Sequence, residues 1–254
     1  MDLRLLAVGF GIMPMGAILL VFLEGRLRSR EALVWGALIG IVAFLGIAHA
    51  AATILELDSQ FTAGAGASAV TLALGLLLGL GLGWFLLGRT TGGGVSFASR
   101  VAWAALVFLA LHSVSDGQVL GEAYAGPLPL GWTLTPLIVS ATFVHRFAEG
   151  ALVVVPALVA SWRPVKSLGL LTVGLLTLPA AYLPVALFAS GYSSATLTAD
   201  QATLMFVSSL KMGIAFMLIL IGLLPRVVTQ KDPRWAVAAG LAFLAMFLVH
   251  FAVE

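Results

Sequence analysis

The stretch VAWAALVFLALHSVSDGQVLGE, residues 101–122, decides the fold class. It is an apolar run of the length that a helix needs to cross a bilayer, roughly 20 residues. The run nevertheless contains the motif HSVSDG at 112–117, in which a histidine is followed four residues later by an aspartate and then a glycine. A second phrase, HRFAEG at 145–150, repeats the pattern with a glutamate in an equally apolar setting. The repetition raises the question of what function these ionisable residues have inside a membrane.

The composition of the whole chain is that of an integral membrane protein. Of 254 residues, 61% are hydrophobic and 9% are charged, whereas soluble domains average about 25% charged residues. No polar stretch is long enough to fold separately, so we expect a single transmembrane domain over residues 1–254. The formal net charge of +2 is too small to indicate nucleic-acid binding, and a sequence without cysteine offers no disulfide or thiolate ligand.

Apolar runs of similar length recur along the chain and predict an all-α polytopic bundle. Only helices and closed barrels satisfy their backbone hydrogen bonds in lipid, and these runs are too long and too uniformly apolar for barrel strands. The eight transmembrane helices are expected near residues 3–23, 32–55, 65–88, 101–122, 132–161, 165–190, 201–224 and 235–253.

Positive charges alternate from one connection to the next. The connections that follow the odd-numbered helices hold ten Lys and Arg residues, and the other connections hold none. By the positive-inside rule, the charged connections face the cytoplasm and both termini are extracytoplasmic. We expect a multi-pass protein of the cell's inner (plasma) membrane. The ten residues are Arg26, Arg28, Arg30, Arg89, Arg100, Arg163, Lys166, Arg226, Lys231 and Arg234.

The ionisable residues at membrane depth are the candidates for function, because each charge there costs on the order of 2.5–3.5 kcal/mol to insert. His112 and Asp116 share one helix face, as do His145 and Glu149, since residues four apart are helix neighbours. Two facing helices would bring two imidazoles and two carboxylates to one point, a set that suits a divalent first-row ion. One such pair is more often a packed histidine, but two pairs in consecutive helices favour a metal site. Glycines follow both carboxylates, and we expect Gly117 and Gly150 to let these helices approach closely.

The two motifs resemble the transport-site motifs in the fourth and fifth helices of the ZIP (Zrt/Irt-like) family of divalent metal transporters. LPAAYLP at 178–184 is similar to the proline-containing sixth helix of that family, and GIAFMLILIGLLP at 213–225 is similar to the seventh. The resemblance implies an eight-helix bundle with both termini outside. It also implies that the ligands of the primary transport site are His112, Asp116, His145 and Glu149.

The chain departs from the family where many members hold a second metal. It has Ser113, Arg146 and Leu178 at those positions, so we expect one metal instead of a binuclear centre. Arg146 lies three residues before Glu149 and can reach it, and a guanidinium is a permanent cation whose fork matches a carboxylate. Our hypothesis is that Arg146 replaces the second metal by neutralising and orienting Glu149 or Asp116. The alternative is a pairing with a backbone carbonyl or with water.

The sequence allows two roles for each of two other ionisable residues. Lys211 is either a counter-ion for Asp116 or Glu149, or a side chain that faces an inner water-filled cavity. His49 is either a metal-relay residue at the entrance or a plain histidine at the outer mouth. A third residue, His250, is expected at the membrane interface.

Glycines in the third expected helix concern the packing of the chain. Gly75, Gly79 and Gly83 recur at the spacing that lets helices approach closely. This stripe favours tight packing inside one chain, and the alternative is a homodimer face.

The two histidine–carboxylate motifs and their resemblance to the ZIP family predict a membrane transporter that moves divalent transition-metal ions into the cytoplasm by alternating access. Zinc is the first candidate, followed by iron, manganese and cadmium, and the metal is substrate instead of cofactor. Ligands bind metal deprotonated, so uptake is expected to weaken in acid. One alternative is an intramembrane metal-dependent hydrolase; without an HExxH or HxxxH pair we expect no enzyme. The other alternative is a transport-inactive homologue that senses metal.

Overall fold

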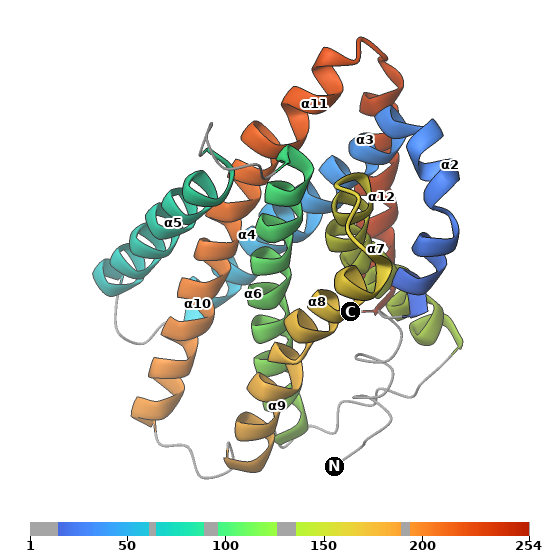
Figure 1. Ribbon diagram of the computed structural model, residues 1–254. Coiled ribbons are helices and arrows are strands. Elements are labelled where there is room, and N and C mark those ends of the chain that lie inside the picture. Colours follow the sequence, from blue (N-terminus) through green and yellow to red (C-terminus); the bar gives the residue numbers. More distant parts are fainter. Residues whose placement is uncertain (1–14, 61–64, 89–95, 126–135, 189–193, 254) are drawn as a thin grey trace.

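The protein is a bundle of helices (Figure 1). The computed structural model describes residues 15–60, 65–88, 96–125, 136–188 and 194–253, and these contain no strand. Residues 15–22 are helical and lead into the first named helix. The named elements are α2 (Glu24–Ser29), α3 (Glu31–Val42), the π-helical turn η1 (Ala43–Ala48), α4 (His49–Gln60), α5 (Ala65–Leu87), α6 (Phe97–Ala125), α7 (Pro136–Val159), α8 (Pro164–Leu175), α9 (Thr177–Phe188), α10 (Ser194–Met217), the π-helical turn η3 (Leu218–Leu223), α11 (Leu224–Thr229) and α12 (Arg234–Val253).

Six helical segments of the described chain are long and apolar enough to cross a membrane, which indicates a membrane-embedded protein. A shorter apolar helix, Arg234–His250, falls where the last span is expected. The expected first span, 3–23, lies largely outside the described residues. The six segments are Glu31–Leu55, Ala65–Leu87, Phe97–Gln118, Ser140–Val159, Pro164–Pro184 and Gln201–Thr229.

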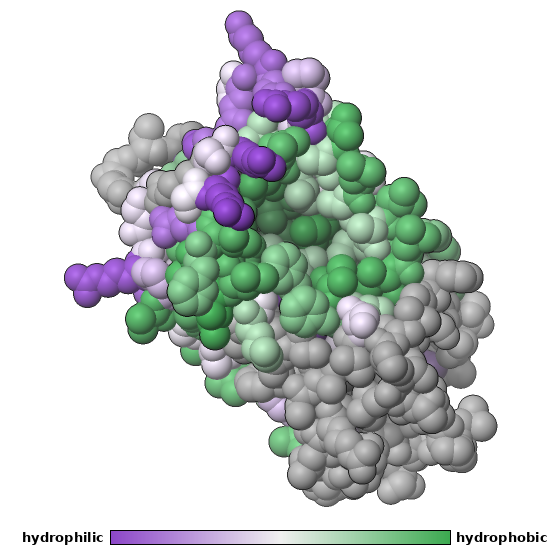
Figure 2. All heavy atoms as spheres, turned by 90° about the vertical axis from the view of Figure 1, so that its right-hand side faces the viewer, coloured by the Kyte–Doolittle hydropathy of each residue, from purple (hydrophilic) through white to green (hydrophobic). Residues whose placement is uncertain are grey.

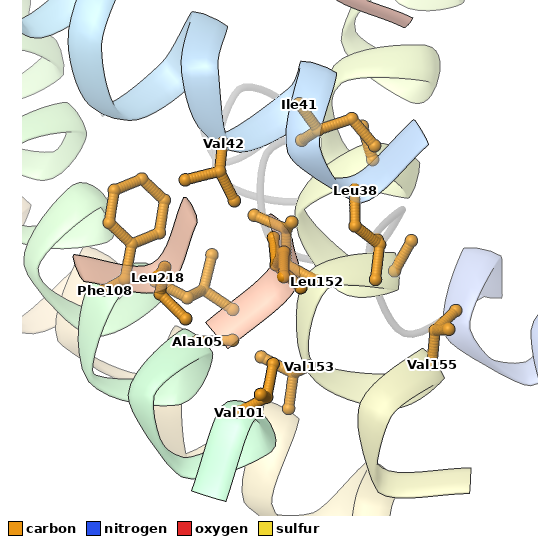
Figure 3. Packing of buried hydrophobic residues seen from close by; sticks show 14 of the residues in the cluster. Leu38, Ile41, Val42, Val101, Ala105, Phe108, Leu152, Val153, Val155 and Leu218 are labelled. Carbon is orange, nitrogen blue, oxygen red and sulfur yellow. The ribbon is translucent and has the colours of Figure 1, made fainter. Parts of the chain in front are cut away.

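The interior is formed where α3, α6, α7 and η3 meet (Figure 3). Val42 of α3, Phe108 of α6, Leu152 of α7 and Leu218 of η3 each have 2% or less of their surface exposed. Burial of such aliphatic and aromatic side chains among complementary neighbours fixes how each helix is rotated about its axis. The rotation of α6 and α7 in turn decides which of their polar residues face each other.

The glycine stripe of α5 lies against α10 of the same chain. A β-carbon on Gly75 would collide with Ser209 and the carbonyl of Phe206, and one on Gly79 would collide with the carbonyl of Leu210. A β-carbon on Gly83 would likewise overlap the side chain of Met217. The prediction of tight packing inside one chain is therefore confirmed, because these glycines let the two backbones approach closely.

The span expected at 165–190 is divided into α8 and α9 at Leu176. Pro179 lies just beyond the break, where its ring interferes with the preceding turn and it has no N–H to donate. The Thr177 hydroxyl donates to the carbonyls of Gly174, at 2.7 Å, and of Ala110 in α6, at 3.0 Å. The break is thereby tied to α6, the helix that carries His112.

The outer surface of the bundle is largely hydrophobic. Figure 2 shows one apolar face, with hydrophilic residues gathered toward one end of it. On α5 and α12, large side chains such as Leu77, Trp84, Val237 and Leu241 are more than half exposed. Contiguous apolar surface of this kind is what a protein presents to lipid.

Candidate metal centre

The four predicted ligands lie together between α6 and α7, which pack side by side. His112 and Asp116 project from one face of α6, and His145 and Glu149 project from one face of α7, as their four-residue spacing predicts. One ligand atom from each of these four side chains lies within 4.8 Å of the other three. The structure thus brings together the imidazole and carboxylate pairs that the two repeated phrases supply.

The distances between the ligand atoms are close to, but not yet those of, a coordination shell. Nε2 of His112 and Nε2 of His145 lie 2.9 and 3.0 Å from Oε1 of Glu149. Nε2 of His112 is 3.7 Å from Oδ2 of Asp116. Ligands bonded at about 2.0–2.2 Å to a tetrahedral ion are roughly 3.3–3.6 Å apart, so small shifts convert this cluster into such a shell.

The cluster is largely buried. The side chains of His112 and Glu149 are fully buried, whereas those of Asp116 and His145 are 16% and 17% exposed. The buried Nε2 of His112 faces Oε1 of Glu149 at 2.9 Å. A buried nitrogen needs a polar partner, and a bound metal could take the place of this contact.

Arg146 bridges the two carboxylates. Its Nη1 donates to Oε1 and Oε2 of Glu149, at 2.9 and 2.8 Å, and lies 3.0 Å from Oδ2 of Asp116. The residue is only 6% exposed, so this is a buried ion pair of the kind that arginine forms well. Nη1 of Arg146 thus contacts carboxylate oxygens, and not a backbone carbonyl or water as the alternative proposed. These include the carboxylate oxygens that face the imidazoles of His112 and His145.

Lys211 approaches the cluster from α10. Its buried Nζ is 3.1 Å from Nδ1 of His112 and donates to Oγ of Ser115 at 3.4 Å. Within the described parts of the chain it forms no direct ion pair, although its charge lies near both carboxylates. Sequence reasoning missed the contact with His112, because 99 residues separate the two positions. Ser115 was recognisable only as a helix neighbour of His112 at i+3.

Ser113 and Leu178 are two of the positions on which the expectation of a single metal rests. Ser113 and Leu178 are both fully buried, and a leucine side chain cannot bind a metal. The backbone of Leu178 lies against Gly117, where a β-carbon would collide with its carbonyl. The expectation that Gly117 lets α6 approach α7 is therefore wrong, because this glycine faces α9 instead.

His49, the first residue of α4, lies beside the cluster. Its ring packs edge-on against His112, with centroids 5.7 Å apart, and against His250 of α12, at 4.7 Å. The π-helical turn η1 directly precedes His49, and such turns often occur at functional sites. The contact with His250 was not foreseen, since nothing in the local sequence connects α4 with α12.

The donor set defines the chemistry that the cluster can perform. Two imidazole nitrogens and two carboxylate oxygens accept Zn²⁺ and neighbouring first-row ions, and they replace the water that such an ion carries. A divalent metal is thus a fitting ligand for a site enclosed by apolar helices.

Comparison with known proteins adds no family: no protein-family model matches the chain, and no curated protein matches its sequence. The function must therefore be argued from the residues of the cluster and their surroundings.

Proposed function

We propose that the protein is a ZIP-like transporter that moves divalent transition-metal ions across the membrane, with zinc as the first candidate. The observation that carries this proposal is the buried cluster of His112, Asp116, His145 and Glu149 inside an apolar helical bundle. Ionisable residues within membrane spans are costly and typically mark an ion pathway. Here they offer a dehydrated ion a complete set of nitrogen and oxygen ligands.

The charges around the cluster support transport over permanent storage. Arg146 and Lys211 offset the charges of Asp116 and Glu149, so the metal-free cluster is close to neutral. A divalent ion that binds without displacing these cations brings an excess of positive charge into a buried place. Such binding is weaker than it would be at two uncompensated carboxylates, and an ion that binds less tightly is more readily released.

A single metal is proposed for the central cluster. Arg146 holds Oδ2 of Asp116 and both oxygens of Glu149, which is the bridging position that a second cation would otherwise take. The guanidinium is covalently attached and cannot leave the protein. It therefore keeps the carboxylates oriented while the transported metal binds and departs.

Eight helices with both termini outward, and uptake toward the cytoplasm, complete the proposal. They are supported by the alternation of charged and uncharged connections, which the positive-inside rule relates to orientation. Tags at the two ends, probed in intact cells with an impermeant reagent, test this topology. Labelling of either tag only after the cells are permeabilised would refute it.

The test of function is metal flux into proteoliposomes that contain the purified protein and an enclosed zinc-sensitive dye. Glu149→Gln removes a ligand charge and is expected to reduce both Zn²⁺ binding and flux by about a hundredfold or more. Glu31→Gln is the matched control, because Glu31 also accepts hydrogen bonds from an arginine, Arg226, but lies away from the cluster. Flux that is equal in these two variants would contradict the proposed site.

The hydrolase alternative is separated in the same preparation. A transporter accumulates Zn²⁺ inside the vesicle without altering lipid or peptide substrates. Hydrolysis that depends on Glu149, in the absence of flux, would replace transport with an enzymatic function.

A further inference from the structure

The histidines of this chain form one continuous row. The sequence contains four, and each lies on a different helix: His250 on α12, His49 on α4, His112 on α6 and His145 on α7. Successive ring centroids are 4.7, 5.7 and 5.9 Å apart. Two of the rings belong to the metal cluster described above, and the other two extend the row away from it.

His49 and His250 are placed to share an ion. Two imidazoles bound to one tetrahedral metal have ring centroids about 5 Å apart, and these two centroids are separated by 4.7 Å. Nδ1 of His49 is buried and has no hydrogen-bond partner among the described residues, which leaves a nitrogen available for coordination. Phe44 of η1 packs edge-on against His250 at 5.5 Å and helps to hold its ring in place.

We propose that His49 and His250 form a second metal-binding station, at which two imidazole nitrogens and water hold a divalent transition-metal ion before it reaches the central cluster. This inference rests on the proposed transport function. The ring of His49 contacts that of His112, so the ion passes between stations without crossing an apolar gap. The central cluster adds two carboxylates, and it therefore attracts the ion more strongly than the histidine pair does.

The place of the pair in the bundle makes it the outer of the two stations. α12 begins at Arg234, beside a connection that also carries Lys231, and the positive-inside rule assigns that end to the cytoplasm. His250 is near the opposite end of α12, so it lies toward the external side. An ion taken up from outside meets this pair first.

The donor set also predicts which ions pass. Imidazole nitrogens favour Zn²⁺, Ni²⁺, Co²⁺ and Cu²⁺, whereas Mg²⁺ and Ca²⁺ prefer oxygen ligands. A first station whose protein ligands are both imidazoles therefore discriminates against Mg²⁺ and Ca²⁺, which prefer oxygen ligands from the protein.

The experiment counts Zn²⁺ bound to the purified full chain by equilibrium dialysis and mass spectrometry. We expect the protein to bind one ion that is lost in Glu149→Gln and an additional, weaker ion that is not. His49→Phe and His250→Phe keep an aromatic ring in each place but remove the nitrogens. Each variant should lose the additional ion, and the double variant should lose no more than either single one, because the two residues act as a unit.

A role in packing alone would leave the metal count of the phenylalanine variants unchanged, and that result would overturn the proposal. A wild-type protein that binds only the Glu149-dependent ion would overturn it as well. Loss of an ion in the phenylalanine variants, with no ion dependent on Glu149, would instead contradict the central site while the histidine pair stands.

Uptake gives a second measurement that does not depend on dialysis. With Zn²⁺ well below saturation, initial flux should fall about tenfold in each phenylalanine variant, the effect of losing roughly 1.4 kcal/mol of binding. Retention of the Glu149-dependent ion shows that a variant is folded. If a phenylalanine variant also loses that ion, the measurement is repeated with His49→Asn and His250→Asn. Normal flux in a folded phenylalanine or asparagine variant would refute the second station.

Discussion

Replacing Arg146 with glutamine removes the cation that bridges the two carboxylates of the central cluster. Glutamine is uncharged and cannot reproduce the contacts of Nη1 at 2.8, 2.9 and 3.0 Å with Glu149 and Asp116. Two buried carboxylates then lose the cation that binds both of them directly, and Lys211, which contacts His112 and Ser115, is the cation that remains nearby. Breaking a buried pair in this way costs about 3–5 kcal/mol, so the metal-free variant should unfold at a clearly lower temperature than the wild type.

The same substitution should make metal binding tighter. A metal bonded at about 2.1 Å to these oxygens lies roughly 4 Å from Nη1, given the O–N distances above. The repulsion between the guanidinium and each unit of metal charge is then about 4 kcal/mol at an effective dielectric constant of 20. Structural relaxation and water reduce this repulsion energy. We therefore expect Arg146→Gln to raise Zn²⁺ affinity by at least about tenfold, and by at most about a thousandfold for each unit of charge on the metal.

Binding, stability and flux measured together test this reasoning. Competition with a fluorescent chelator gives the affinity, and thermal unfolding with and without Zn²⁺ should show that the metal stabilises Arg146→Gln more than the wild type. Flux at saturating Zn²⁺ should fall, because a tightly held ion is released slowly. Arg146→Lys keeps the charge and is the matched control, while Arg226→Gln breaks an arginine–glutamate pair elsewhere. Zn²⁺ affinity that stays the same or falls in Arg146→Gln would refute the role assigned to the guanidinium.

Other expected outcomes concern the metal count and the packing. Arg146→Asp should bind one more Zn²⁺ than the wild type, counted by mass spectrometry; an unchanged count together with normal flux would exclude Arg146 as a substitute for a second metal. Gly79→Ala should destabilise the protein by about 1–3 kcal/mol, because the added β-carbon would meet the α10 backbone. Gly81→Ala should be neutral or stabilising, because no described atom lies within 4 Å of the position of its β-carbon. Equal unfolding temperatures for the two variants would contradict the packing of α5 against α10. Glu31→Gln should cost at most about 1 kcal/mol, because its pair with Arg226 is about one-third exposed, and a larger loss would mean that this pair holds the bundle together.

Local spacing was enough to predict which residues form the central cluster. His112 with Asp116, and His145 with Glu149, are paired by the four-residue period of a helix, and the structure places all four together. The reach of Arg146 to Glu149 follows from the same period. These contacts lie within one helix, or between two helices that are consecutive in the sequence, and the repeated phrase indicated that both motifs serve one site.

What surrounds the cluster was decided only by the tertiary structure. The contact of Lys211 with His112, the pairing of His49 with His250, and the packing of Gly117 against α9 all join segments far apart in the sequence. Each depends on how a helix is rotated about its axis and on which neighbour it meets. An almost uniformly apolar membrane helix carries little amphipathic pattern to indicate that rotation, so side-chain packing across the bundle has to set it.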